Sequence, residues 1–318
     1  MQKNEREGSE PMKKLSLILA LIMLISCALV GCTLPEDELD GIKVITTAFV
    51  GYDLARQVGG DDVNVSLLLP VGAESHTYEP TPRDIINISK CDLFIYVGGE
   101  SESWVDELLN DDIKPKMMIK MMDLVELLTE EHDHDHDHDI GKTAYDEHVW
   151  TSPKNTLKLL DAVNDALTEI DATKKEAFES NYKKYRSEIE VLDNGFREFF
   201  ATFEKPTLVF GDRFPLSYFA HEYGIDHYSA FHGCSSESEP SAQVVASLID
   251  KVKTENIPAV FYIELSNHKV ADTIAEATGA RTALFNTCHN VTLEQFESGE
   301  GYVSLMKKNL ETLKEVLG

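Results

Sequence analysis

One long helix limits the folds open to this chain more than any other feature. The segment from Thr173 to about Phe203 has no proline, a single glycine, and apolar residues every three to four positions. This spacing predicts an amphipathic helix, and roughly 30 residues of helix extend about 45 Å, which is longer than one small domain is wide. We therefore predict a rigid helix that joins two halves of the molecule.

Short strands alternate with helices on both sides of this helix. The predicted strands cover residues 43–50, 63–70, 93–97, 117–123, 207–210, 259–263 and 282–285. The predicted helices cover residues 51–58, 156–170, 218–223, 242–255, 269–278 and 302–316, and a further helix opens at Thr81-Pro82. Such alternation is typical of parallel sheets covered by helices. The predicted fold class is α/β, with two doubly wound α/β lobes joined by the long backbone helix and a ligand site in the cleft between the lobes.

The first residues have the features of an export signal. Lys13-Lys14 precede an apolar stretch, Leu15 to Val30, which is shorter than the roughly 20 residues that a spanning helix needs. Leu29-Val30-Gly31-Cys32 resembles a bacterial lipobox, in which Cys32 is lipidated and begins the mature chain. We expect a signal peptide over 1–31 and a lipidated tether over 32–41, and an ordinary N-terminal membrane anchor is the alternative. The remainder is then expected at the extracytoplasmic face of the cell membrane.

Charge and cysteine usage fit that location. The chain has 29 Lys and Arg against 56 Asp and Glu, a net charge of −27, which repels nucleic acid and anionic membrane surfaces and attracts cations. We therefore expect no nucleic-acid partner and membrane contact only through the lipid. Cys91 begins an apolar run, whereas Cys234 and Cys288 lie in polar loops. Because exported proteins can keep disulfides, we pair Cys234 with Cys288 as a hypothesis, the alternative being a sulfur that binds metal.

Residues 130–139 alternate imidazole with carboxylate. Four His-Asp repeats follow two glutamates, with histidines at His132, His134, His136 and His138. Imidazole is the commonest protein ligand for borderline metals such as zinc, and the segment has no apolar periodicity that would place it in a core. The alternative is an acidic loop with incidental histidines, like a purification tag, but a tag stands at a terminus. A flexible polyanion loses much entropy on chelation, so we expect weak, auxiliary metal collection here.

Three isolated histidines follow predicted strand ends or precede a predicted helix. His76 comes after the strand that ends at Pro70, His148 precedes the helix start at Ser152-Pro153, and His289 follows the strand that ends at Phe285. Ligands of open α/β sheets gather at the carboxyl ends of the strands. Three neutral imidazoles from separate loops suit a tetrahedral zinc site with one position left over. We predict His76, His148 and His289 as metal ligands.

The chain resembles the zinc- and manganese-binding lipoproteins of bacterial metal-import ABC transporters, the solute-binding proteins of cluster A-I. The resemblance covers the mature chain and rests on the lipobox at Cys32, Gly72-Ala-Glu-Ser-His76 before Thr81-Pro-Arg-Asp84, the acidic His-rich insertion, Asp146-Glu-His-Val-Trp-Thr-Ser-Pro153 and the closing helix. It implies an N-terminal lobe over 42–155 that carries the His-rich loop, a helical connection over 156–204 and a C-terminal lobe over 205–318. It also implies His76 and His148 as ligands, zinc rather than manganese as cargo, a permease as partner, and a monomer without catalytic activity.

The chain departs from that family pattern in two places. A histidine usually precedes the Asp of the first loop in the C-terminal lobe, but here Gly211 precedes Asp212. Either Asp212 moves in as a ligand, or His232 replaces the missing group, or the site has three protein ligands. The last family ligand is a carboxylate, and His289 falls at that position. Glu74 is a weaker candidate ligand.

Two other functions compete with metal capture. A zinc hydrolase also uses three ligands and an activated water, but the chain has no His-Glu-x-x-His helix and no Gly-x-Ser-x-Gly turn. A lipid-anchored surface adhesin that needs no metal is permitted by the anchor alone. We expect an extracytoplasmic protein that captures zinc and delivers it to a permease.

Overall fold

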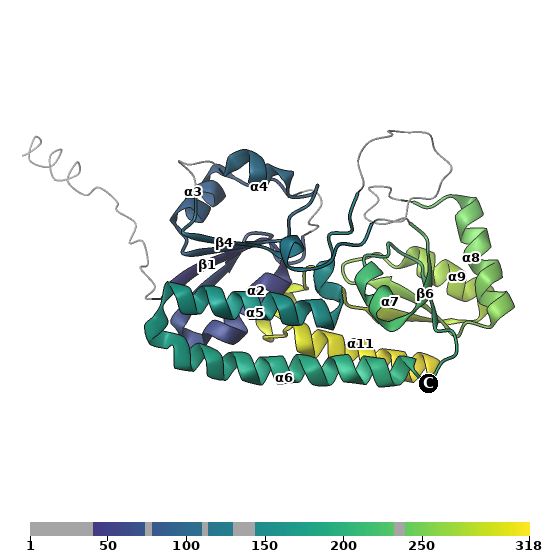
Figure 1. Cartoon of the computed structure of the whole chain (residues 1–318). Coiled ribbons are helices and arrows are strands. Elements are labelled where there is room, and N and C mark those ends of the chain that lie inside the picture. The colour runs from purple at the N-terminus through teal and green to yellow at the C-terminus, as the bar shows by residue number, and fades with distance from the viewer. Residues whose placement is uncertain (1–40, 74–77, 110–113, 130–143, 232–238) are drawn as a thin grey trace, which may run out of the picture. The chain divides into compact units, whose positions relative to one another are not determined.

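The computed structural model describes residues 41–318 apart from 74–77, 110–113, 130–143 and 232–238 (Figure 1). Several predicted features therefore lie outside the described residues. These are the signal peptide, the lipidation site Cys32, Glu74, His76, the His-Asp repeats, His232 and Cys234. None of the helices in the described part of the chain combines the length and hydropathy that a membrane crossing requires.

The described residues form two parallel four-stranded sheets, which confirms the predicted α/β class with two lobes. The N-terminal sheet has the order β2-β1-β3-β4, and the C-terminal sheet has the order β6-β5-β7-β8. The strands are β1 Ile42–Thr46, β2 Val63–Leu67, β3 Leu93–Tyr96, β4 Met117–Lys120, β5 Thr207–Phe210, β6 Asp226–Ser229, β7 Ala259–Ile263 and β8 Arg281–Phe285. In each sheet the chain reverses its direction of winding beside the first strand, between β1 and β3 and between β5 and β7. A doubly wound sheet binds ligands at such a point, beyond the carboxyl ends of the strands.

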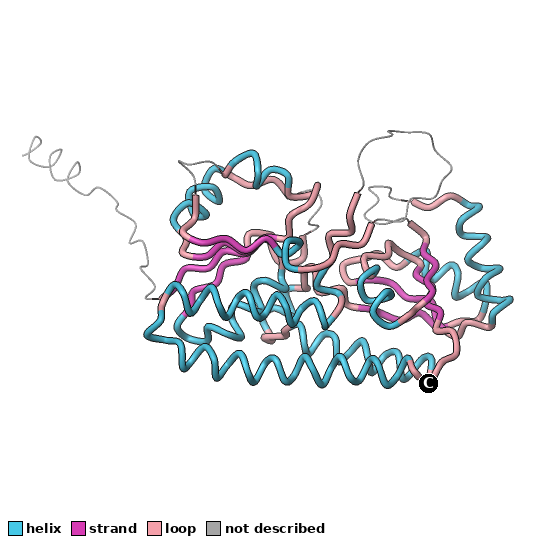
Figure 2. The backbone as a smooth tube through the Cα atoms, in the orientation of Figure 1, coloured by secondary structure: helices cyan, strands magenta, loops and turns pink. Residues whose placement is uncertain are grey.

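Helices cover both faces of each sheet. The helices are α2 Phe49–Gly59, α3 Pro82–Lys90, α4 Ser103–Leu108, α5 Pro153–Ile170, α6 Lys175–Phe200, α7 Ser217–Tyr223, α8 Ala242–Glu255, α9 Lys269–Thr278, α10 Leu293–Glu297 and α11 Tyr302–Leu317. Side chains of α3 and α4 form a separate apolar cluster with one face of the N-terminal sheet, and those of α8 and α9 do the same on the C-terminal sheet. The other faces share one continuous core with α2, α5, α6 and α11. Figure 2 shows these last helices as a layer beneath the strands.

The long helix runs along both sheets, as predicted. α6 has 26 residues, or about 39 Å of helix, and it packs against α5 and α2 as well as against α7 and α11 (Figure 1). Its buried residues lie on one face of the helix, with spacings of three or four positions from Tyr185 to Phe199. They are Phe178, Tyr185, Ile189, Leu192, Phe196, Phe199 and Phe200. Because this one apolar stripe belongs to the core of both halves, bending between the halves would expose part of it. The packing therefore favours a stiff connection.

Several predicted boundaries need correction. The first strand ends at Thr46, and Phe49-Val50, predicted as strand, open α2 instead. Of the predicted strand 117–123, only residues 117–120 form β4, and the chain continues as a single 3-10 turn, Met121–Leu124. β6 was not predicted, because its four residues are polar or half-buried and carry no strong apolar alternation. The helix starts at Thr81-Pro82 and Ser152-Pro153 are confirmed, since both Thr81 and Ser152 accept a hydrogen bond from the backbone of the first turn.

Candidate metal centre

His148 is fixed in one orientation by a buried carboxylate. It is 2% exposed and stands directly before the single turn Val149–Thr151. Asp146 Oδ1 lies 2.9 Å from His148 Nδ1 and accepts a 2.7 Å hydrogen bond from the His148 backbone N–H. Burial raises the pKa of Asp146, but the His148 ring and its hydrogen bonds outweigh burial and lower that pKa below its usual value. An ionised Asp146 accepts a hydrogen bond from the Nδ1–H of His148, and in this tautomer Nε2 is the ring nitrogen that could bind a metal ion, as in many zinc sites.

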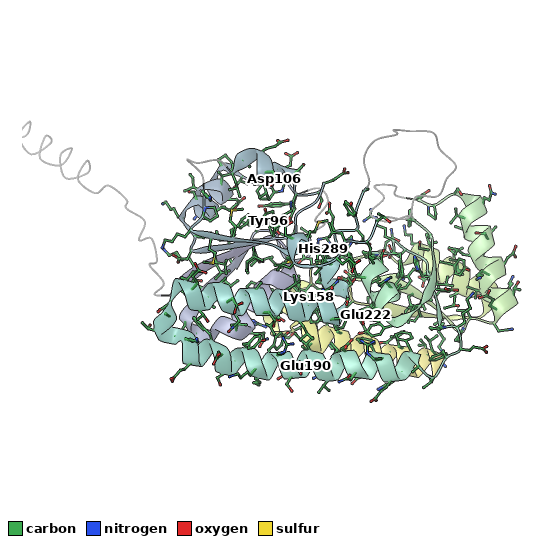
Figure 3. All side chains as sticks on the ribbon, viewed as in Figure 1. Tyr96, Asp106, Lys158, Glu190, Glu222 and His289 are labelled. Carbon is green, nitrogen blue, oxygen red and sulfur yellow. The ribbon has the colours of Figure 1, made fainter. Side chains whose placement is uncertain are left out.

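His289 stands beside His148 in the loop that follows β8. The centroids of the two rings are 5.3 Å apart, with the ring planes at 77°. If zinc binds two imidazoles at about 2.0–2.1 Å with a tetrahedral angle, and each nitrogen lies about 1.1 Å from its ring centroid, the centroids come to about 5.2 Å apart. The observed spacing therefore fits two imidazoles on one zinc ion. Figure 3 shows His289 between the two halves of the molecule.

The Trp150 ring packs against both histidine rings. Its ring meets the rings of His148 and His289 edge to face, at centroid distances of 5.5 and 5.1 Å. It is fully buried, and its Nε1 donates a 2.9 Å hydrogen bond to the carbonyl of Thr287 in the His289 loop. The Tyr302 hydroxyl donates to the Trp150 carbonyl at 3.1 Å. The segment that carries His148 is thus bonded both to the His289 loop and to α11.

The residues on either side of the undescribed segment 74–77 belong to the same region. Asn290 Nδ2 donates to the carbonyls of Pro70 and Ala73, at 2.9 Å each. The backbone N–H of Phe49 donates to the His289 carbonyl at 3.1 Å. Tyr78 lines a small pocket together with His289 and Trp150. Both Ala73 and Tyr78, which bracket the segment containing His76, are therefore close to the His289 loop.

This pocket lies at the carboxyl ends of β1 and β3, where the N-terminal sheet reverses its winding. Its free volume is about 20 Å³, enough for about one water molecule or ion. The lining residues are Thr47, Leu69, Tyr78, Val97, Ser101, Glu102, Trp104, Glu147, Trp150 and His289. The pKa of Glu102 is raised to about 7, mainly by burial and further by the charge of Glu147. Hydrogen bonds from Thr47 and from the Gly98 backbone N–H act in the opposite direction and lower this pKa. Glu147 itself accepts from the Ser101 backbone at 2.9 Å and from the Ser101 hydroxyl.

The raised pKa of Glu102 predicts a pH-dependent stability. Between about pH 4.5, where an unfolded Glu loses its proton, and about pH 7, the folded protein binds the extra proton, so stability falls as pH rises. Glu102→Gln removes this dependence and is expected to raise the free energy of unfolding by about 1–3 kcal/mol near pH 8 and little near pH 5. Urea unfolding of the metal-free protein at both pH values measures it. Glu107→Gln, an exposed position of the same helix, is the control, and an equal gain at both pH values would contradict the explanation.

Asp212 stays within its own half of the molecule. Its carboxylate accepts from the backbone N–H groups of Arg213 at 2.9 Å and Ile263 at 3.4 Å. The space around Gly211 explains why no histidine stands at this position, because a Cβ there would lie 2.4 Å from the backbone of Ala271 on α9. No larger residue fits unless α9 moves. Among the described residues, no three His, Cys, Asp or Glu side chains converge closely enough to hold an ion, so the predicted site depends on the segment that carries His76.

Two buried groups of the site were not predicted. Glu264 follows β7 directly and accepts hydrogen bonds from the Thr287 backbone N–H at 2.7 Å and its hydroxyl at 2.5 Å. Asn309, in the middle of α11, is fully buried and bonds to Asn286 at the start of the His289 loop. Sequence signals exist for both. Glu264 is an acidic residue at a strand's carboxyl end, and Asn309 is a polar residue on an otherwise apolar helix stripe.

Three further histidines and two cysteines of the described residues have other partners or surroundings. His268 is the residue directly before α9, and its Nδ1 lies 2.8 Å from the Asp272 carboxylate. His221 is exposed in the last turn of α7, and His227 stacks on Phe214 at a centroid distance of 3.7 Å. Cys91 and Cys288 are buried, and neither forms a disulfide with another described residue. Because Cys234 lies outside the described residues, its pairing with Cys288 stays a prediction, which the mass with and without reductant would test.

Comparison with known proteins identifies the family. The family model described as "Zinc-uptake complex component A periplasmic" matches residues 44–316. The zinc-binding lipoprotein AdcA of Streptococcus pneumoniae is 34% identical over 96% of this chain, which spans only 61% of that protein. The high-affinity zinc uptake system protein ZnuA of Bacillus subtilis is 34% identical over 89% of each chain.

A solved structure agrees with the sequence comparisons. The crystal structure of the Zn(II)-bound ZnuA-like domain of Streptococcus pneumoniae AdcA has a TM-score of 0.72 at 31% identity and covers 87% of this chain and 98% of that one. The extent of the family match and the identity to ZnuA lead to one conclusion. The chain belongs to the family of periplasmic component A proteins of zinc-uptake complexes.

Proposed function

We propose that this protein is a lipid-anchored, extracytoplasmic binding protein that captures zinc and delivers it to the permease of an ABC transporter. The observation that carries the proposal is the pair His148 and His289, whose ring spacing of 5.3 Å fits two imidazoles on one zinc ion. His76 is the third ligand in this proposal, since the residues that bracket its segment contact or line the same site. Cys32 is the site of lipidation, and the protein acts as a monomer.

The donor set favours zinc over manganese. Three imidazoles are borderline donors that suit zinc, whereas manganese prefers carboxylate and water oxygens. In the structure the nearby carboxylates are engaged elsewhere, Asp146 with His148 and Glu264 with Thr287. Asp212 is the reserve ligand of the proposal. The hydrolase alternative gains no support from the relatives, which are named as zinc-binding and zinc-uptake proteins.

Titration of the metal-depleted chain from residue 32 to 318 with zinc tests the proposal. We expect one site with submicromolar affinity that survives competition with excess manganese. Isothermal titration calorimetry gives both the affinity and the stoichiometry. The absence of a tight zinc site, or a tighter manganese site, would overturn the proposal.

The His-Asp segment is proposed to collect zinc for the tight site. The described residues at its ends are joined by an antiparallel bridge between Thr129 and Tyr145 and by a 2.9 Å bond from the Asp146 N–H to the Leu128 carbonyl. The segment therefore leaves and rejoins the fold close to His148 in the chain.

Deletion of residues 130–139 separates collection from tight binding. We expect the affinity of the tight site to stay within about threefold, because His148, Asp146 and their bonds remain, while several weaker zinc equivalents are lost from the titration. Cells that carry the deletion should take up zinc more slowly only when zinc is scarce. Loss of the tight site on deletion would show instead that the segment supplies a ligand.

A further inference from the structure

The His289 loop is held by buried side chains rather than by regular secondary structure. It follows β8 and includes Cys288, whose φ of 61° lies in the left-handed region that non-glycine residues rarely adopt. Asn286, Thr287, Cys288 and Asn290 are all buried. A loop with this backbone keeps one conformation only when its surroundings fix it. The contacts of Asn286 and Thr287 show what fixes it.

Asn309 of α11 binds both backbone groups of Asn286. Its Oδ1 accepts from the Asn286 backbone N–H at 2.8 Å and from the Asn286 side-chain amide at 3.0 Å. Its Nδ2 donates to the Asn286 carbonyl at 2.7 Å. A buried amide that pairs with both the N–H and the carbonyl of one residue defines where that residue stands. The apolar neighbours of Asn309 on α11 could not do this.

Glu264 fixes the next residue of the loop. It accepts from both the backbone N–H and the hydroxyl of Thr287, and the same hydroxyl accepts from the His289 backbone N–H at 3.3 Å. Two successive residues before His289 are therefore anchored, one to α11 and one to the end of β7.

α11 is itself tied to the segment that carries His148. The Tyr302 hydroxyl at its first turn donates to the Trp150 carbonyl, and Trp150 donates back to the Thr287 carbonyl in the loop. This closes a bonded circuit through Trp150, α11, Asn309 and the loop. We infer that Asn309 is a positioning residue for zinc binding, which sets His289 at the distance from His148 that one zinc ion requires. Glu264 supports it from the other side of the loop. The inference rests on the proposed function for its zinc readout.

Asn309→Asp tests the inference with little change in size. The carboxylate can still accept from Asn286, but it cannot donate to the Asn286 carbonyl and repels that oxygen. We expect zinc affinity to fall about 10- to 100-fold, as for other groups that orient a metal ligand. The visible absorption of the cobalt-loaded protein, which reports coordination geometry, should also change. A variant that is less stable but keeps both the affinity and the cobalt spectrum would overturn the inference.

Asn181→Asp is the matched control. Asn181 Nδ2 donates to the Val58 carbonyl at 3.0 Å in the same manner, between α6 and the end of α2. We expect it to keep the zinc affinity and the cobalt spectrum of the unchanged protein. If Asn309→Asp does not fold, Thr287→Val is measured instead. This change removes the hydroxyl that donates to Glu264 and accepts from the His289 N–H. Zinc affinity and the cobalt spectrum are then read in the same way.

A readout without metal separates the inference from the proposed function. The ring signals of His289 in nuclear magnetic resonance spectra of the metal-free protein should shift in Asn309→Asp and stay in place in Asn181→Asp. If the unchanged protein fails to bind zinc but the His289 signals respond as expected, the proposed function is wrong and the positioning role stands. Unmoved His289 signals would contradict the positioning role whatever metal binds.

Discussion

Replacing His76 and His148 together by alanine is expected to abolish tight zinc binding. Mutation of a residue that only orients a metal ligand lowers metal affinity about 10- to 100-fold. Removal of two direct ligands should therefore lower zinc affinity at least about 10⁴-fold. The Nδ1 of His148 is hydrogen-bonded to Asp146, and the centroid of its ring lies 5.3 Å from that of the His289 ring. Isothermal titration of the double variant should show only weak, multiple binding.

The matched control removes two histidines outside the site. His221 and His268 are exposed, one in α7 and one at the start of α9. His221→Ala with His268→Ala should leave the affinity of the tight site unchanged. Circular dichroism of both double variants confirms that they fold. Unchanged zinc affinity in His76→Ala with His148→Ala would rule out the proposed ligand set, and with it the proposed capture mechanism.

The fold could be predicted to a large extent because its signals are local. Helix starts at Thr81 and Ser152 depend on a capping side chain and a following proline, both visible in the sequence. The boundary at β1 was wrong for a tertiary reason. Phe49 and Val50 are apolar enough for a strand, but the backbone of Thr47 bonds to Ile95 of β3 and that of Phe49 bonds to His289, and α2 begins there.

The candidate site could be predicted only in part. The sequence predicts His148 and His289 as ligands because each stands near a strand or helix end, but their 5.3 Å ring separation depends on packing that no local pattern contains. Asn309 and Glu264 were missed because they contact the backbone of other residues rather than a ligand. Gly211 shows the same limit, since the reason for its small size is the close approach of α9.

Asp53→Ala is expected to destabilise the fold more than any other single change considered for these residues. Asp53 on α2 is fully buried, and its carboxylate accepts from the Tyr302 backbone N–H at 2.9 Å, from the Tyr185 hydroxyl of α6 and from Arg56. It therefore joins α2, α6 and the first turn of α11. Gly301 fits this contact, because a Cβ there would stand 2.6 Å from the Asp53 carboxylate.

Loss of this carboxylate leaves two buried donors unpaired, at a cost of about 1–3 kcal/mol each. We expect the free energy of unfolding to fall by about 3–5 kcal/mol and the melting temperature by about 10 °C, measured by urea and thermal unfolding. Asp193→Ala is the control, since Asp193 has similar partners in Tyr223 and Arg197 but is partly exposed, and it should cost about 1 kcal/mol. An equal loss in the two variants would show that the Asp53 contact does not depend on burial. α11 carries Asn309 as well as Tyr302, so a loosened first turn of this helix should also weaken zinc binding. If Asp53→Ala is destabilised but keeps its full zinc affinity, the position of the His289 loop does not depend on this end of α11.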